Sequence, residues 1–146
     1  MDDDSVTAVV VDAALGIHRR VGPGLLETVY EAMLARVLER RGLRVARQRV
    51  FSFELDGILF RDGVRIDPLV EDRIVVELKS VERLLPVHTK QLLTYLRVLK
   101  LPVGLLINFG CATLKEGLRR VVNDYSPAGL DLGEPPRLSV HLRGSA

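Results

Sequence analysis

Two carboxylates and a lysine stand inside a stretch whose other residues predict buried β-strands. The stretch RIDPLVEDRIVVELKS, residues 65–80, is rich in branched apolar side chains between positions 66 and 78, yet it holds Asp67, Glu77 and Lys79. Ionised groups are seldom placed in such a segment unless they are paired, bind a metal or serve a function. These three residues are therefore the first candidates for chemistry.

A hairpin through this stretch would bring the two acids together. If the turn is centred on Asp72, residues whose numbers add to 144 lie opposite each other, and Asp67 faces Glu77 with Cβ atoms roughly 5 Å apart. Because side chains alternate along a strand, Glu77 and Lys79 share one face of it, and the intervening apolar residues share the other. One face then builds core and the opposite face collects charge.

This arrangement has one functional and one purely structural interpretation. Two ionised carboxylates repel each other in a poorly solvated site unless a proton or a cation lies between them. Oxygen ligands without Cys or His favour Mg²⁺ or Mn²⁺ over Zn²⁺, and Lys79 would orient or deprotonate water, or stabilise charge on a phosphate. The alternative is that Asp67, Glu77 and Lys79 form a cross-strand ion-pair ladder on a solvated face, and spacing alone does not decide between the two.

Four segments of the chain resemble one nuclease family. Asp67, nine residues and then Glu77-Leu78-Lys79 resemble the active-site motif of the PD-(D/E)XK nuclease superfamily, and GLLETVY at 24–30 resembles the motif that names the GxxExxY proteins, a bacterial branch of it. HTKQLLTYL at 88–96 and GLLINFG at 104–110 extend the resemblance over roughly residues 8–122. The sequence departs at one place, since Pro68 follows Asp67 instead of preceding it, which predicts a bulge or an edge position there.

The resemblance implies a site for one or two metal ions, Mg²⁺ or Mn²⁺. Asp67 and Glu77 would be metal ligands, Glu27 an additional carboxylate ligand, and a main-chain carbonyl near Leu78 a further one. From its position alone, Glu27 has another interpretation, because a carboxylate in the first turn of a helix stabilises the helix dipole without any function.

The resemblance also implies catalytic roles on the strand and on a later helix. Lys79 would position the attacking water, and Gln91 with Tyr95 would orient the lysine or the scissile phosphate. Their spacing puts Gln91 and Tyr95 on one helix face. His88 shares that face, where it would contact nucleic acid or would only be a capping or surface histidine.

A basic segment is the candidate nucleic-acid contact. RVLERRGLRVARQR, residues 36–49, holds six arginines against one acid, and we expect Arg41, Arg44 and Arg47 to bind nucleic-acid phosphates. A solvated helix face explains part of the pattern equally well. The net charge of +2 neither demands nor excludes a nucleic-acid partner, and the few aromatic residues argue against dedicated single-strand recognition.

The elements that must position these residues follow from periodicity and turn signals. Apolar spacing predicts helices over residues 5–21, with Ser5 as the N-cap, and from about 26 to 41, ended by Gly42. A meander of at least three strands follows, with turns at the two Asp-Gly pairs, 56–57 and 62–63. A helix after Pro86, a buried strand over 103–109 and a last helix carrying Leu114, Leu118, Val121 and Val122 complete an α/β fold with a mixed central sheet flanked by helices.

Length and composition favour one domain in a reducing compartment. At 146 residues and 47% hydrophobic content the chain suits a single domain over residues 1–125, followed by a tail over 126–146 in which RLSVHLR alternates like an edge strand. The one cysteine, Cys111, has no internal disulfide partner, the N-terminus lacks a basic signal region and no run is long enough to span a membrane. We expect a cytoplasmic protein.

Three functions are compatible with these residues. We expect a Mg²⁺-dependent nuclease that hydrolyses phosphodiester bonds of nucleic acid, with DNA as the preferred substrate. The main alternative is a non-catalytic module that keeps the fold and uses the basic segment to bind DNA, RNA or a protein. A third, an interaction protein with a surface ion-pair ladder, would require Glu27, Asp67 and Glu77 to lie far apart.

Overall fold

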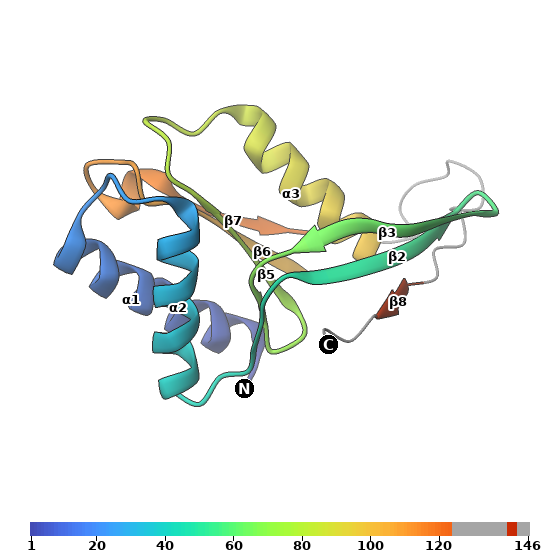
Figure 1. The fold of residues 1–146 in the computed structure, drawn as a ribbon, viewed down its shortest axis with the longest axis horizontal. Helices are drawn as coiled ribbons and strands as arrows, with labels where there is room; N and C mark the ends of the chain where they lie inside the picture. The colour runs from blue at the N-terminus through green and yellow to red at the C-terminus, as the bar shows by residue number, and fades with distance from the viewer. Residues whose placement is uncertain (124–139, 143–146) are drawn as a thin grey trace.

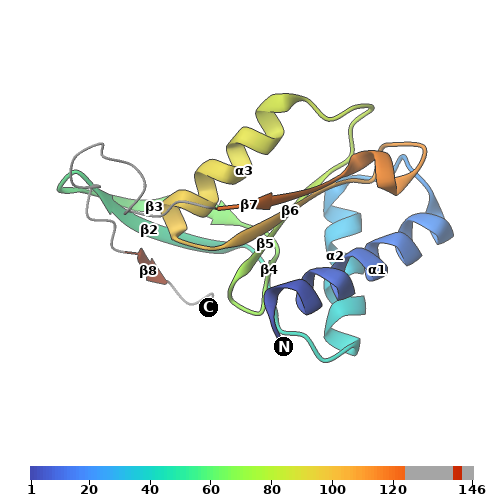
Figure 2. The ribbon, with the colours of Figure 1, turned by 180° about the vertical axis from the view of Figure 1, so that it is seen from behind.

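A computed structural model of the chain describes residues 1–123 and 140–142. Its helices are α1 (Asp3–Val21), α2 (Glu27–Arg40) and α3 (Pro86–Leu99), with a short 3-10 helix η1 (Leu114–Gly117). Its strands are β1 (Val45–Ala46), β2 (Arg49–Leu55), β3 (Ile58–Ile66), β4 (Leu69–Val70), β5 (Ile74–Lys79), β6 (Val103–Asn108), β7 (Leu118–Val122) and β8 (Val140–Leu142). Figures 1 and 2 show α1 and α2 on one side of the central strands and α3 on the other.

The central sheet is mixed, as the sequence predicts. Its strand order is β1-β4-β5-β6-β7, in which β5 and β6 run parallel and the other neighbours run antiparallel. Leu69 pairs with Val75 and Val70 with Ile74, so the hairpin register predicted around Asp72 is confirmed.

Both faces of β5 are covered for most of its length. Ile74, Val76 and Leu78 belong to a core cluster with residues of α1 and α2, whereas Val75 belongs to a second cluster with residues of α3. Because side chains alternate along a strand, Glu77 and Lys79 lie on the same side of the sheet as α3. The charged face therefore begins only where the apolar residues of that face end, at the carboxyl end of β5.

The first helix begins earlier than the sequence predicts. Asp2 is the N-cap of α1, and its side chain accepts a hydrogen bond of 2.8 Å from the backbone N–H of Ser5. Ser5 itself lies within the first turn, where Asp3 and Asp4 also favour the positive end of the helix dipole. Ser5 is thus the residue whose N–H is capped and is not the cap.

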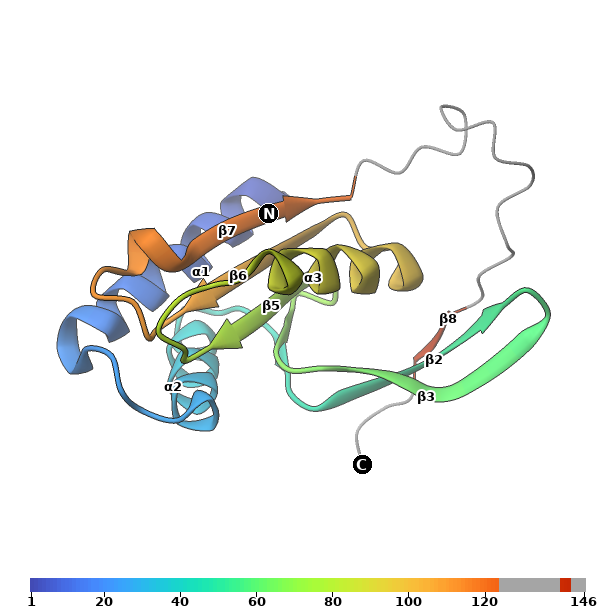
Figure 3. The same cartoon turned by 90° about the horizontal axis from the view of Figure 1, so that it is seen from above.

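The predicted meander divides between two sheets. The turn at Asp56 and Gly57 joins β2 to β3 as predicted, but the second Asp-Gly pair lies inside β3 and makes no turn. There Asp62 has φ of 54°, its N–H donates to the hydroxyl of Ser52 at 3.0 Å, and the pairing register shifts. The pair forms a β-bulge, and Figure 3 shows the long β2–β3 hairpin extending away from the helices.

The last predicted helix is wrong over most of its length. Residues 114–117 form the single turn η1, and the chain then continues as β7, which pairs antiparallel with β6. Val121 is buried in β7, whereas Arg119, Arg120 and Val122 are exposed. The apolar spacing from Leu114 to Val122 matches a helix, but pairing with the edge of β6 satisfies the backbone and outweighs that local pattern.

The C-terminal tail is described only at β8, which pairs with the edge of β2 inside the segment predicted as an edge strand. The rest of the predicted tail, 126–139 and 143–146, lies outside the described residues, and the domain boundary at 125 stays a prediction. Among the helices of the described residues, none has the length and apolar character needed to cross a membrane.

Candidate active site

The candidate site lies beside the carboxyl end of β5, past the short part of that strand that pairs with β4. The backbone N–H of Val76 donates to the carbonyl of Pro68 at 3.1 Å, which continues the register of β4 and β5 by one position. Asp67 comes one position further and is joined to Pro68 by a cis peptide bond. It lies outside the paired residues, so its position opposite Glu77 stays a prediction. The sequence predicts a bulge or an edge position at Pro68; the structure has a break between two strands there, since β3 ends at Ile66 and β4 starts at Leu69.

Lys79 and Glu77 form a partly buried ion pair at the end of β5. Their Nζ and Oε1 atoms are 3.5 Å apart, and their side chains are 19% and 24% exposed. Burial raises the pKa of Glu77 above its usual value, Lys79 opposes the shift, and the charges of Glu27 and Asp67 add to it. Burial is thus the main cause of the raised pKa, and Lys79 opposes it more strongly than either neighbouring acid adds to it.

Glu31 joins these acids although the sequence analysis did not single it out. Burial above all, and then the charge of Asp67, raises the pKa of Glu31 to about 7, while Arg47 opposes the shift. The charges of Glu27 and Glu77 raise the pKa of Glu31 further. The available signal was its spacing, because residues four apart lie on one face of a helix and Glu31 follows Glu27 by four. We call Glu27, Glu31, Asp67 and Glu77 the acidic cluster.

Asp67 presents an oxygen that nothing in the described part of the chain satisfies. Its Oδ1 atom is buried and has no hydrogen-bond partner, and the nearest charge is the Nε atom of Arg47 at 3.6 Å. That Nε atom also has no hydrogen-bond partner. A buried carboxylate oxygen without a donor is costly, which fits a position that a bound cation would complete.

The acidic cluster fits a hard divalent cation in its chemistry. All four side chains offer oxygen ligands, the charges of the other three raise the pKa of Glu31, and Asp67 has an unsatisfied oxygen. Among the described residues, no group of three His, Cys, Asp or Glu side chains lies close enough together to hold a metal ion. The carboxylates therefore share one region without forming a closed ligand set.

A buried tyrosine explains the last position of the GLLETVY segment. The hydroxyl of Tyr30 donates to the carbonyl of Gly22 at 2.6 Å and accepts from the N–H of Leu25 at 3.2 Å. Its ring stacks on Phe109, with centroids 4.2 Å apart. Tyr30 thus fastens the loop that leads into α2 and so fixes where Glu27 begins the helix.

The same loop is tied to the strand that carries Lys79. The hydroxyl of Ser80 donates to the carbonyl of Leu25 at 2.6 Å, and the N–H of Phe109 donates to the carbonyl of Lys79 at 2.8 Å. The end of β5 is therefore held on one side by the loop before α2 and on the other by β6. The sequence analysis assigned no role to Ser80, and a lone serine carries no signal for such a contact.

Gln91 and Tyr95 are joined on α3 as their spacing predicts. The amide Nε2 of Gln91 donates to the hydroxyl of Tyr95 at 2.9 Å. Tyr95 packs against the core cluster under α3, which contains Val75 of β5. The pair therefore lies on the same side of the sheet as Glu77 and Lys79.

The predicted nucleic-acid contacts are dispersed over the molecule. Arg41 pairs with Asp12 of α1 at 2.7 Å, and Arg44 pairs with Glu71 at 3.2 Å in the turn before β5, the end of that strand opposite to Glu77. Of the three predicted arginines, Arg47 is the one whose charge acts on the acidic cluster.

His88 caps the N-terminus of α3, which is one of the roles that the sequence analysis left open. Its Nδ1 atom accepts a hydrogen bond of 3.1 Å from the N–H of Leu85, the N-cap of α3. A contact between His88 and nucleic acid stays a prediction.

Comparison with known families gives one result that covers most of the chain. The sequence model of the PD-(D/E)XK nuclease superfamily matches residues 4–121, which include every element from α1 to η1 and nearly all of β7. Neither the curated proteins nor the solved structures contain a match.

Proposed function

The chain belongs to the PD-(D/E)XK nuclease superfamily, and we propose that it is a divalent-metal-dependent nuclease that hydrolyses phosphodiester bonds of nucleic acid, with DNA as the preferred substrate. The acidic cluster beside Lys79 supports this proposal most, because a surface ion-pair ladder would not gather four mutually repelling carboxylates in a partly buried place. We further propose that the chain is a GxxExxY protein, since GLLETVY spans Glu27 and the buried Tyr30, and that it acts in the cytoplasm.

Mg²⁺ or Mn²⁺ is the proposed cofactor. Asp67 and Glu77 would hold the ion, and Glu27 and Glu31 would supply ligands from α2. When bound, the ion supplies Lewis-acid polarisation of the phosphoryl group and lowers the pKa of the attacking water. The oxygen-only donor set and the unsatisfied oxygen of Asp67 support this choice of cofactor.

A main-chain oxygen of β5 also points toward the cluster. The N–H of Val76 points to the β4 side and the carbonyl of Lys79 points to the β6 side. Since backbone groups alternate along a strand, the carbonyl of Leu78 points to the β4 side as well. This carbonyl would be the further main-chain ligand that the family resemblance implies near Leu78.

Lys79 would act directly on the reacting groups. Its ammonium lies beside Glu77, so it would hold the attacking water by a hydrogen bond and offset negative charge that develops on the phosphate. Gln91 and Tyr95 would orient the scissile phosphate or the lysine from the α3 side, because their mutual hydrogen bond holds both side chains in one arrangement.

Arg47 would have a more indirect role. It stands 3.6 Å from Asp67, where it lowers the local repulsion among the carboxylates, and it would contact a phosphate once a cation takes over that task. Arg41 and Arg44 would contribute to non-specific affinity only by leaving their present acidic partners.

A cleavage panel with a matched lysine control tests the proposed function. Linear, nicked and single-stranded DNA and RNA are incubated with Mg²⁺ or Mn²⁺ and the wild type, Lys79→Ala or Lys90→Ala; Lys90 is exposed on α3. We expect Lys79→Ala to abolish metal-dependent cleavage and Lys90→Ala to retain it. No cleavage by the wild type above the Lys79→Ala level, with DNA still retained, would replace the nuclease by the non-catalytic binding module.

A further inference from the structure

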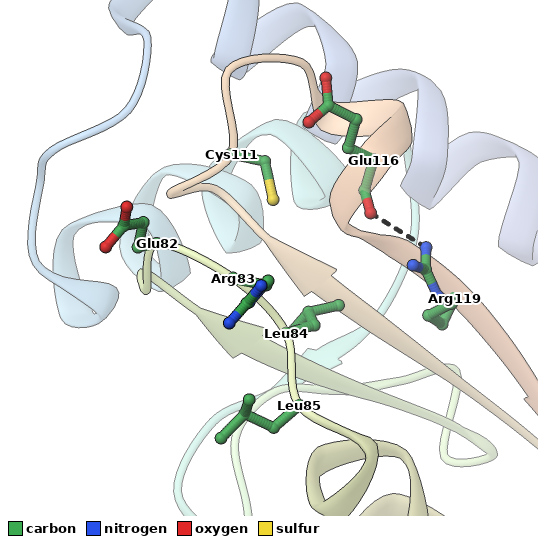
Figure 4. A pocket seen from close by; sticks show the side chains of 7 residues that line it. All are labelled: Glu82, Arg83, Leu84, Leu85, Cys111, Glu116 and Arg119. Carbon is green, nitrogen blue, oxygen red and sulfur yellow. Dashed lines mark hydrogen bonds between the residues drawn. The ribbon is translucent and has the colours of Figure 1, made fainter.

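A concave region opens at the carboxyl ends of the parallel strands β5 and β6. It has a volume of about 610 Å³. Residues 82–85, between β5 and α3, form one wall, and Cys111, Glu116 and Arg119 form the other (Figure 4). In open α/β sheets this end of the strands is where ligands bind. The size suits a small organic ligand such as a nucleotide.

The walls of this cavity are fastened to each other by Asn108, which is fully buried. Its side-chain amide accepts from the N–H of Val81 at 3.0 Å and donates to the carbonyl of Val81 at 2.9 Å. It also accepts from the N–H of Gly110 at 3.0 Å and donates to the Sγ atom of Cys111 at 3.2 Å. The loop after β5 and the loop after β6 are thus clamped together, so the cavity is formed before any ligand binds.

Gly110 shows how closely the two loops approach. A Cβ atom at this position would lie 2.1 Å from the carbonyl oxygen of Val81, which no side chain tolerates. The cavity therefore depends on a glycine as well as on Asn108.

The cavity is close to the candidate active site along the chain. Arg83 follows Lys79 by four residues, so no more than roughly 14 Å of extended chain separates their Cα atoms. Phosphates repeat about every 3.4 Å along the axis of a duplex strand. A strand with its scissile phosphate at Lys79 would therefore place a phosphate at Arg83 within a few nucleotides.

Two arginines of the cavity lining are available to an anion. The guanidinium of Arg119 donates to the carbonyls of Glu116 and Leu118 at 3.0 and 2.8 Å, which fixes its position on the wall. Neither Arg83 nor Arg119 pairs with a carboxylate in the part of the chain that the structure describes. Unpaired guanidinium groups in a concave site are well suited to phosphate.

Two carboxylates share the lining with these arginines, those of Glu82, which is exposed, and Glu116. The carboxylate of Glu116 accepts from the hydroxyl of Thr113 at 2.8 Å, and Figure 4 shows it turned away from the guanidinium of Arg119. Leu84 is half-buried and Leu85 is 50% exposed, so both present apolar surface on the loop beside Arg83. The cavity thus combines guanidinium, carboxylate and apolar groups, and its two guanidinium groups without a carboxylate partner are the ones that suit the phosphate of a nucleotide.

We propose that this cavity binds one nucleotide of the substrate strand, a few positions from the scissile phosphate, with its phosphate on Arg83 and Arg119 and its sugar and base against Leu84 and Leu85. The proposal rests on the proposed function in so far as the ligand is nucleic acid. It adds that the enzyme holds the strand on the β5–β6 side of Lys79.

Binding of short oligonucleotides tests the proposal without requiring cleavage. Fluorescein-labelled hexathymidylate and hexauridylate are titrated in Ca²⁺ against the wild type, the Arg83→Gln/Arg119→Gln double variant and an Arg36→Gln/Arg97→Gln control, whose arginines are exposed on α2 and α3. We expect the first double variant to bind at least tenfold more weakly and with a shallower salt dependence, and the control to stay within twofold. Equal affinities of the two double variants would overturn the proposal.

The one cysteine of the chain locates the ligand. Cys111 lines the cavity with only 8% of its surface exposed, so its alkylation by iodoacetamide is slow; saturating hexathymidylate should slow it several-fold further in the wild type and should leave the rate unchanged in the Arg83→Gln/Arg119→Gln variant. An alkylation rate that bound oligonucleotide does not change in the wild type would contradict a ligand in this cavity.

The outcomes separate this proposal from the proposed function. Lys79-dependent cleavage with unaltered KM in the Arg83→Gln/Arg119→Gln variant would reject the cavity and keep the nuclease. Loss of oligonucleotide binding in that variant, with protection of Cys111 but no cleavage by the wild type, would reject the nuclease and keep the cavity as a nucleotide site.

Discussion

The ammonium nitrogen of Lys79 lies 3.5 Å from a carboxylate oxygen of Glu77, two residues earlier on the same strand. The two side chains share a face because strand positions two apart do so. This contact alone would be an ordinary ion pair, but the pKa of Glu77 stays above its usual value despite it. Burial of Glu77 and the neighbouring carboxylates keep this pKa raised, and the following predictions use the cost of holding partly buried carboxylates together.

The pH dependence of stability should reveal Glu31. Its pKa is about 7 in the folded chain against 4.5 for an ordinary glutamate, so between these values the folded state keeps a proton that the unfolded state has released. In metal-free buffer the contribution of Glu31 to the free energy of unfolding is therefore undiminished below pH 4.5, and it falls as the pH rises to about 7. Glu31→Gln lacks this loss, so its Tm should exceed that of the wild type by a few degrees above pH 7 and match it near pH 4.5.

The control for this experiment is Glu39→Gln, an exposed glutamate near the other end of α2. Its Tm should follow the wild-type pH profile. Parallel profiles for Glu31→Gln and the wild type across the whole range would show that Glu31 does not share the charge of the acidic cluster.

Asp67→Asn should separate a metal site from an ion-pair ladder. In metal-free buffer the variant loses a repelling charge, so its free energy of unfolding should be unchanged or higher by up to about 1 kcal/mol. Excess Mn²⁺ should raise the Tm of the wild type and leave that of Asp67→Asn nearly unchanged, because an ion that binds only the folded state stabilises it. Chemical denaturation and thermal scans measure both effects.

The opposite pattern would favour the ladder. A clear loss of stability in Asp67→Asn without metal, combined with no effect of Mn²⁺ on the wild type, would mean that Asp67 serves mainly to pair with Arg47.

Tyr30→Phe should weaken both the fold and the placement of Glu27. The change removes the hydrogen bonds to Gly22 and Leu25 while keeping the ring on Phe109, and unmet polar partners cost about 1–3 kcal/mol. Denaturant unfolding should show that loss, and the stabilisation by Mn²⁺ should also shrink. Tyr95→Phe is the matched control, because among the described residues the hydroxyl of Tyr95 is hydrogen-bonded only by the side chain of Gln91, and the change should cost less than about 1 kcal/mol. Equal losses in the two variants would contradict a special role of the Tyr30 hydroxyl.

The hairpin around β5 was predictable because two strong local rules agree there. Alternating burial fixes which face each residue takes, and a turn centred on Asp72 fixes the register, so the pairing of Leu69 with Val75 follows from the sequence. The resemblance to nucleases then added Glu27, which no local rule distinguishes from a residue that only favours the helix dipole.

Other features depended on contacts that local patterns do not contain. The helix expected after Leu114 gave way to β7 because the edge of β6 offers backbone partners. Arg41 and Arg44 looked like one basic patch with Arg47, but their partners, Asp12 and Glu71, come from distant parts of the sequence. Glu31 was hidden for a similar reason, since its raised pKa arises first from burial in the fold and then from the charge of Asp67, which is distant in the sequence.

A crystal soaked in Mn²⁺ gives the most direct test of the central claim that the acidic cluster binds a divalent cation. The anomalous scattering of manganese locates the ion independently of any activity. We predict a manganese peak between Asp67 and Glu77, with carboxylate oxygens of both at about 2.1 Å, the distance at which Mg²⁺ would also bind. Glu27 or Glu31 should lie in the surrounding shell. The absence of such a peak at saturating Mn²⁺, or a peak bound only elsewhere on the chain, would contradict the account.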